Sequence, residues 1–227
     1  MRFLAWGLAI TLALAIIPAG VWAGTSTSPQ KAPEGWVLVE EDVVLVFADE
    51  PEEHFQKGRE FFLKKDLKAA AHEIREATAF LKLEAGRATE EGKKALLASV
   101  RELDKLVEGV ERGTVTAVKD LDSVFARAHQ ALGRHHHLKS GASWAKKVAK
   151  KTGQDLKAAA IHLEHGLAWT GHKVEAGGTA VVNATRLLAG KLIEGVGWVP
   201  AEVGKGITAV GEEIEKLGKK IEPAKRP

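Results

Sequence analysis

The chain has 227 residues, with 33 Lys and Arg against 30 Asp and Glu, and it contains no cysteine. The lack of cysteine excludes disulfides, lipid attachment through a lipoprotein cysteine, c-type haem attachment, iron–sulfur clusters and thiol catalysis. The nearly balanced charge does not provide the basic face that nucleic-acid binders usually have, so we expect no nucleic-acid partner.

Residues 1–23 have the features of a signal peptide. Arg2 supplies a positive charge, residues 3–17 form an apolar run, and Val21, Trp22 and Ala23 fit a small-x-small cleavage site. A membrane anchor is the alternative, but the apolar run is short for a membrane span and polar sequence follows it directly. We therefore predict an exported protein, periplasmic or extracellular.

Two short segments precede the helical part of the chain. Residues 24–34 are rich in Thr, Ser and Pro, which predicts a flexible tether. Residues 35–48 contain the only run dominated by β-branched and aromatic residues, WVLVEEDVVLVF. Because a lone hairpin is marginally stable in water, we expect an extended segment packed along the helices.

From residue 49 onward the apolar residues recur at helical spacing. Acidic residues around Pro51 mark the start of the first helix, and a basic stretch at residues 137–153 interrupts the pattern. The apolar seams are narrow, as in the 4-3-4-3 spacing of Leu96, Val100, Leu103, Val107 and Val110. Narrow seams are typical of antiparallel bundles. The sequence therefore predicts an all-α antiparallel helical bundle over residues 49–176.

Residues 177–227 form a glycine-repeat, amphipathic helical segment. Glycine recurs there at every seventh position: Gly190, Gly197, Gly204, Gly211 and Gly218. Each interior glycine costs a helix about 1 kcal/mol relative to alanine, so close approach of another helix, or folding on a partner or membrane surface, must offset the cost. A plain helical hairpin with tolerated glycines is the alternative. We expect a kink at Pro200.

Two resemblances concern the first helices. Residues 54–81 resemble a single tetratricopeptide unit in the spacing of five residues, Gly58, Phe61, Ala70, Ile74 and Ala77, although no second unit follows at a period of about 34 residues. The stretch DLKAAAHEIREATAFL is similar to the early helices of periplasmic helical proteins of the YfdX type. That resemblance implies a chaperone-like or stress-related role and transfers no functional residue.

Histidine is the residue type that most indicates chemistry, since seven of the nine histidines fall between residues 129 and 172. His129 and His136 are seven residues apart and share a helix face, and a second stripe follows near residues 162–172. Imidazoles at such spacings can share a metal ion. The candidate transition-metal or haem ligands are His129, His136, His162, His165 and His172. Solvated histidines on helix flanks are the alternative interpretation.

No catalytic motif is present: the chain has no Glu-x-x-His pair, P-loop or nucleophile elbow. We therefore expect a non-enzymatic helical scaffold or interaction protein of the cell envelope, with a protein partner or self-association and no small-molecule substrate. One alternative is a metal- or haem-binding bundle that uses the histidines. The other is a peripheral membrane protein that contacts the membrane surface through residues 177–221.

Overall fold

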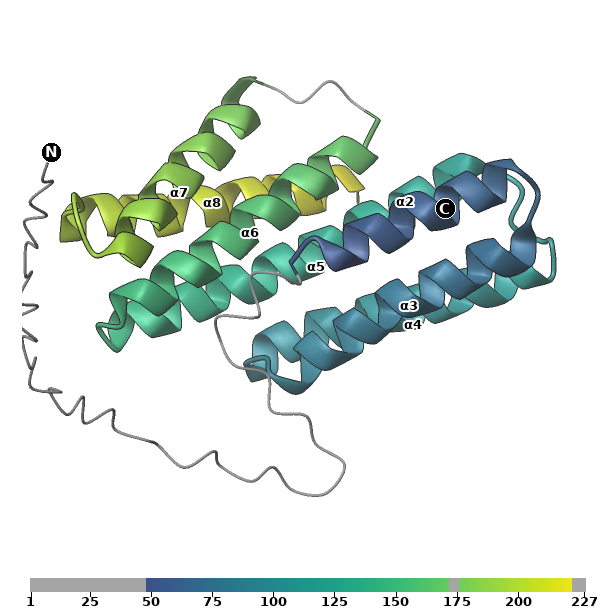
Figure 1. Ribbon diagram of the computed structural model, residues 1–227, viewed down its shortest axis with the longest axis horizontal. Helices are drawn as coiled ribbons and strands as arrows, with labels where there is room; N and C mark the ends of the chain where they lie inside the picture. Colours follow the sequence, from purple (N-terminus) through teal and green to yellow (C-terminus); the bar gives the residue numbers. More distant parts are fainter. Residues whose placement is uncertain (1–47, 172–175, 222–227) are drawn as a thin grey trace, which may run out of the picture. The chain divides into compact units, whose positions relative to one another are not determined.

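The computed structural model describes residues 48–171 and 176–221, and within these ranges all seven regular elements are α-helices (Figure 1). They are α2 (Glu50–Leu63), α3 (Leu67–Gly86), α4 (Glu90–Glu111), α5 (Val118–Ala145), α6 (Ala149–Trp169), α7 (Ala176–Glu194) and α8 (Pro200–Ile221). The all-α bundle is confirmed. The predicted signal peptide, the tether and residues 35–47 of the extended segment lie outside the described residues, as does His172. None of the described helices is both long and apolar enough to span a membrane.

Local signals set the helix boundaries. The Asp66 carboxylate accepts a hydrogen bond from the backbone N–H of Ala69 at the start of α3, and the Thr89 hydroxyl accepts one from Gly92 at the start of α4. Such caps satisfy backbone donors that have no partner within the helix. The predicted interruption at residues 137–153 is confined to a turn of three residues between α5 and α6, in which Lys147 has a φ of 60°.

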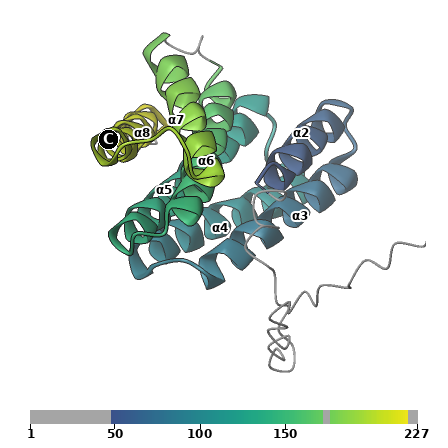
Figure 2. The same cartoon turned by 60° about the vertical axis from the view of Figure 1, so that its left-hand side comes forward.

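Helix α5 is the central element of the bundle. It packs against α2, α3, α4, α6 and α8 (Figures 1 and 2). One apolar cluster is formed by α2 to α5, and a second by α6 to α8. The α5–α6 interface therefore lies where the two clusters meet, and it carries most of the histidines.

The C-terminal segment is a helical hairpin, and the expected kink at Pro200 is wrong. Helix α7 ends at Glu194, and Pro200 is the first residue of α8. Between them Gly195 and Gly197 have φ values of 77° and 69°, a backbone region that glycine enters without steric cost. Proline is compatible with the first helical position because the N–H it lacks would have no partner there. The chain therefore reverses at this point.

The glycine repeat has different roles at different positions. A Cβ on Gly211 would lie 2.6 Å from Nε2 of His137, and one on Gly218 would lie 3.0 Å from Nε2 of Gln130, so both glycines allow α8 to approach α5 closely. Gly190 and Gly204 face open space. Close helix approach therefore explains only part of the repeat.

Two glycines in helix interiors provide a matched test of the packing. A Cβ on Gly153 would lie 2.7 Å from the carbonyl oxygen of Ala189 in α7, whereas a Cβ on Gly141 would meet nothing within 4 Å. We expect Gly153→Ala to lower the free energy of unfolding by about 1–3 kcal/mol, and Gly141→Ala to raise it by up to about 1 kcal/mol. Urea unfolding monitored by circular dichroism measures both effects. Equal effects of the two substitutions would contradict the α6–α7 contact.

Candidate metal centre

Four histidine side chains are buried where α5 and α6 meet. His129, His135 and His136 in α5 and His162 in α6 have exposed fractions of 0, 0, 2 and 1%. Buried polar groups are unfavourable unless they have partners, so their contacts define what the site can do.

These histidines form one continuous row. Nδ1 of His129 lies 3.3 Å from Nδ1 of His162. The ring of His162 is nearly parallel to that of His136, with centroids 5.5 Å apart, and the His136 and His135 rings are 4.8 Å apart. The row arises because His129 and His136 stand two turns apart on α5 and the side chain of His162 from α6 reaches between them.

Glycines on neighbouring helices lie against three of the histidines. A Cβ on Gly166 of α6 would lie 3.4 Å from Cβ of His129, and one on Gly133 of α5 would lie 3.6 Å from Cβ of His162. The arrangement is reciprocal, since each of the two helices presents a glycine to the histidine of the other. Gly92 of α4 has the same relation to His135, because its Cβ would lie 3.2 Å from Nδ1 of that ring.

One end of the row forms a three-residue cluster with Glu84 of α3. Oε2 of Glu84 lies 3.0 Å from Nε2 of His135 and 4.0 Å from Nε2 of His136. Each residue offers one ligand atom, and these atoms lie within 4.8 Å of one another. Within residues 48–171 and 176–221 no other group of three histidines and carboxylates has this geometry.

Charged and polar groups of α5 and α6 lie near His136. Its Nδ1 lies 3.7 Å from Oδ1 of Asp155, whose other oxygen accepts a hydrogen bond of 3.2 Å from the Ser143 hydroxyl. Lys139 Nζ lies 3.6 Å from Oδ1 of Asp155. A proton on Nδ1 of His136 would point toward Asp155 and leave Nε2 free to bind an ion, as carboxylates commonly arrange for histidine ligands. Nδ1 of His135 and Nδ1 of His136 have no hydrogen-bond partner.

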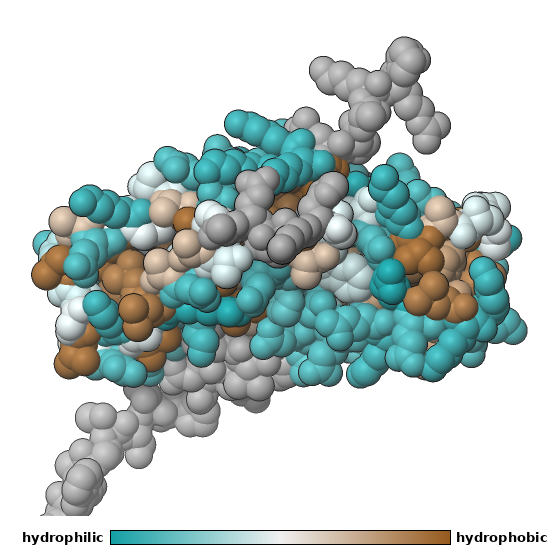
Figure 3. All heavy atoms as spheres, turned by 90° about the horizontal axis from the view of Figure 1, so that it is seen from above, coloured by the Kyte–Doolittle hydropathy of each residue, from teal (hydrophilic) through white to brown (hydrophobic). Residues whose placement is uncertain are grey.

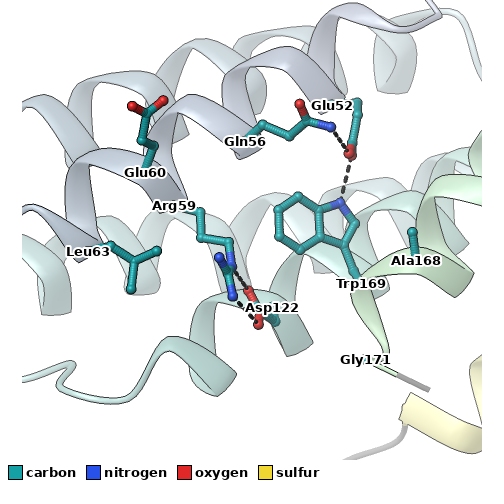
Figure 4. A pocket seen from close by; sticks show the side chains of 9 residues that line it. All are labelled: Glu52, Gln56, Arg59, Glu60, Leu63, Asp122, Ala168, Trp169 and Gly171. Atoms are coloured by element: carbon teal, nitrogen blue, oxygen red, sulfur yellow. Dashed lines mark hydrogen bonds and ion pairs between the residues drawn. The ribbon is translucent and has the colours of Figure 1, made fainter. Parts of the chain in front are cut away.

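The other end of the row meets Glu52, whose carboxylate is already occupied by N–H donors. It accepts hydrogen bonds of 2.6 Å from Nε1 of Trp169 and 2.7 Å from Nε2 of Gln56 (Figure 4). Nε2 of His129 lies 2.9 Å from Oε2 of Glu52, although the oxygen is off the line of the ring N–H bond. Each end of the row therefore has a carboxylate that is held by two N–H donors, Trp169 and Gln56 at Glu52, and His135 and Arg87 at Glu84.

A cavity of about 450 Å³ lies beside Glu52. Trp169 and Glu52 form one side, and on the other side Nε of Arg59 donates a 2.8 Å hydrogen bond to Asp122 (Figure 4). The cavity connects the surface with the carboxylate that contacts the histidine row.

Burial favours the uncharged form of three imidazoles of the row, those of His129, His135 and His162. It lowers the pKa of His129 and His135 more than their carboxylate neighbours raise it. Burial and the neighbouring imidazoles bring the pKa of His162 well below its ordinary value of 6.5. Neutral imidazole is the form that binds metal ions.

The two carboxylates remain ionised. Burial would raise the pKa of Glu84, but the hydrogen bond from His135 and the positive charge of nearby groups outweigh it and lower the pKa to about 2. The contacts of Glu52 with His129, Trp169 and Gln56 likewise overcome burial and lower its pKa to about 2. Hydrogen-bond donation from His135 to Glu84, and from Trp169 and Gln56 to Glu52, therefore helps to keep both carboxylates ionised.

The structure brings together four of the five predicted histidines: His129, His136, His162 and the more exposed His165, whose ring centroid is 5.3 Å from that of His129. His165 lies beside the row, with its Nε2 3.0 Å from Oδ1 of Asp49, and does not belong to the three-residue cluster. His172 lies outside the described residues.

The sequence patterns did not single out His135, Glu84 or Asp155 as site residues. His135 continued an apolar seam of α5, and Glu84 is 51 positions away from it in the chain. One sequence signal could have indicated Glu84. It follows Ala77 and Leu81, both buried, at helical spacing, so an acidic residue stands where the apolar stripe of α3 continues.

The buried imidazoles predict that acid destabilises the metal-free protein. In the unfolded chain the histidines take up protons near pH 6.5, whereas the lowered pKa values of His129, His135 and His162 keep these residues unprotonated in the folded protein. The free energy of unfolding therefore falls as the pH drops below 6.5, by up to about 1.4 kcal/mol per pH unit per histidine. The stabilisation from Glu52 and Glu84 is present above pH 4.5 and is lost between 4.5 and about 2.

Urea unfolding at pH 7, 6 and 5 with a chelator present measures the first window. His162→Phe should reduce the slope by about one proton, and His72→Gln, at an exposed position of α3, should leave it unchanged. A free energy of unfolding that stays constant from pH 7 to 5 would contradict the buried neutral row.

Comparison with known proteins found no matching family model, no matching curated protein and no matching solved structure. The resemblances to the YfdX type and to a tetratricopeptide unit therefore stay predictions, and the site is interpreted from its own geometry.

Proposed function

We propose that this protein binds a divalent first-row transition-metal ion, such as Zn²⁺ or Co²⁺, between Glu84, His135 and His136. The observation that carries the proposal is the cluster itself, in which three potential ligand atoms lie within 4.8 Å of one another in the protein interior. Burial lowers the pKa of His135, and Glu84 is ionised, which favours metal binding; the proton that His135 Nε2 shares with Glu84 would move to Nδ1 or be released when the ion binds. Two nitrogens and one oxygen favour such an ion over Mg²⁺ or Ca²⁺, which prefer oxygen ligands.

The distances support this assignment. A tetrahedral ion with bonds of 2.0–2.1 Å places neighbouring ligand atoms about 3.3 Å apart. The observed distances of 3.0 and 4.0 Å from Glu84 Oε2 to the two imidazole nitrogens lie on either side of that value. The three ligand atoms lie within 4.8 Å of one another, so side-chain shifts of up to about 1.5 Å would complete the site, and a fourth position would be left for water or another ligand.

The same geometry favours a bare ion over haem. A haem with two axial histidines lies between their rings. The facing nitrogens of His129 and His162 are only 3.3 Å apart, which leaves no space for a porphyrin.

Metal titration of the chelator-treated protein tests the proposal. We expect one Co²⁺ or Zn²⁺ per chain and a rise in melting temperature on binding. Glu84→Gln and His136→Leu should each weaken binding at least about tenfold, because each removes a ligand. His54→Gln is the matched control, since His54 pairs with Glu73 at 2.7 Å outside the cluster, and it should bind as the wild type does. The absence of binding at micromolar metal would overturn the proposal.

A second candidate function, contact with a protein partner or a membrane surface, is supported by the α7–α8 hairpin. Leu187, Val196 and Val199 have exposed fractions of 67, 60 and 51%. Between the helices is a largely apolar groove of about 520 Å³ that includes Leu188 and Gly206. Hydrophobic atoms gather at the left-hand end in Figure 3, the end at which the α7–α8 turn lies in Figure 1. The expected scaffold or chaperone-like role would use this surface, and export through residues 1–23 accords with either function.

Replacing both Val196 and Val199 by lysine tests this surface. We expect the double variant to lose flotation with uncharged phosphatidylcholine vesicles if the partner is a membrane, or to lose concentration-dependent self-association in sedimentation if the partner is a second chain. Leu83→Lys, which changes an exposed apolar residue of α3, is the control and should behave as the wild type does. A wild-type protein that neither floats nor self-associates would contradict both uses of the hairpin.

A further inference from the structure

The two ends of the histidine row differ in their surrounding charge. At the Glu84 end, Nη1 of Arg87 lies 3.5 Å from Oε1 of Glu84, and Nζ of Lys139 lies 3.6 Å from Asp155. Arg87 is 28% exposed and Glu84 14%, so a positive group stands on the solvent side of the carboxylate. The two cations at this end therefore balance the carboxylates of Glu84 and Asp155, and no net negative charge attracts a metal ion from this side.

The lining of the cavity at the other end has a net negative charge. Its lining includes the carboxylates of Glu52, Glu60 and Asp122 against the single guanidinium of Arg59 (Figure 4). Lys64 also pairs with Glu60, but Lys64 is not among the lining residues. A cleft lined mainly by one sign of charge raises the local concentration of the opposite ion. Divalent cations are therefore attracted to this cavity.

The histidine row connects this cavity with the three-residue cluster. Glu52 contacts His129 at 2.9 Å, and His129 Nδ1 lies 3.3 Å from His162 Nδ1, which is close to the distance between neighbouring ligand atoms of a tetrahedral ion. His162 then stacks on His136, whose Nε2 is 4.0 Å from Glu84. A position with two protein ligands binds more weakly than one with three, which suits transit rather than retention.

We propose that the cavity beside Glu52 is the port by which the metal ion enters, and that His129 and His162 hold the ion on its way to Glu84, His135 and His136. This inference rests on the proposed metal-binding function. It gives the histidine row a role in the rate of metal loading, which binding at the three-residue cluster alone does not require.

Rates of metal loading test the route. Chelator-treated protein is mixed with Co²⁺ in a stopped-flow spectrometer, and the equilibrium stoichiometry is measured separately. Ala168→Trp fills the cavity from an exposed position of α6, and His162→Phe removes a transit ligand while keeping a ring. We expect both variants to bind one ion per chain but to load at least about tenfold more slowly. Ala79→Trp, at an exposed position of α3, is the matched control and should load within twofold of the wild type.

Other outcomes overturn the inference. If Ala168→Trp and His162→Phe load as fast as the wild type, the ion does not use this route, while the proposed function stands. If Arg87→Gln accelerates loading, the ion enters past Glu84. Should His162→Phe fail to fold, Ala168→Trp decides alone. A wild-type protein that binds no Co²⁺ removes the proposed function and this inference together.

Discussion

Burying four imidazole rings inside a helical protein constrains everything around them. A ring that was protonated there would need a full countercharge in a medium of low dielectric constant, whereas a neutral ring needs only hydrogen-bond partners. His129, His135 and His162 take the second solution, since burial lowers the pKa of each. Glu52 and Glu84 can then stay ionised at the two ends as acceptors of N–H groups. The two apolar clusters of the bundle meet around this polar row.

The row also explains the arrangement of the central helices. Helix α5 contributes three of the four buried histidines, and it packs against α2, α3, α4, α6 and α8. The partner carboxylates come from α2, α3 and α6, the helices that carry Glu52, Glu84 and Asp155. Ordering of these four helices is therefore coupled to the row, and an ion bound at Glu84 would stabilise the contact between α3 and α5 in particular.

The helices could be predicted from the sequence because apolar periodicity is a local signal. The seam from Leu96 to Val110 is buried along α4 as its spacing predicts. The chain reversal before Pro200 was missed because the apolar residues keep the same helical spacing on both sides of the short turn. Their pattern is then the same as that of one continuous helix. The site was predicted only in part, since His135 and Glu84 are brought together by tertiary packing that no spacing within one helix records. The seven-residue spacing in the sequence showed only that His129 and His136 share one face of a helix.

The reciprocal pairing of glycine and histidine has a consequence for descent. Gly166 opposes His129, Gly133 opposes His162 and Gly92 opposes His135 across helix interfaces. A Cβ at Gly92 would press on the His135 ring, whereas at Gly166 and Gly133 a Cβ would meet the histidine Cβ at ordinary contact distance, so that a side chain longer than that of alanine is needed to displace the histidine. The two members of each pair should therefore be retained or replaced together, so that in a distant relative these three coupled positions would survive as a recognisable signature after the surface residues had diverged.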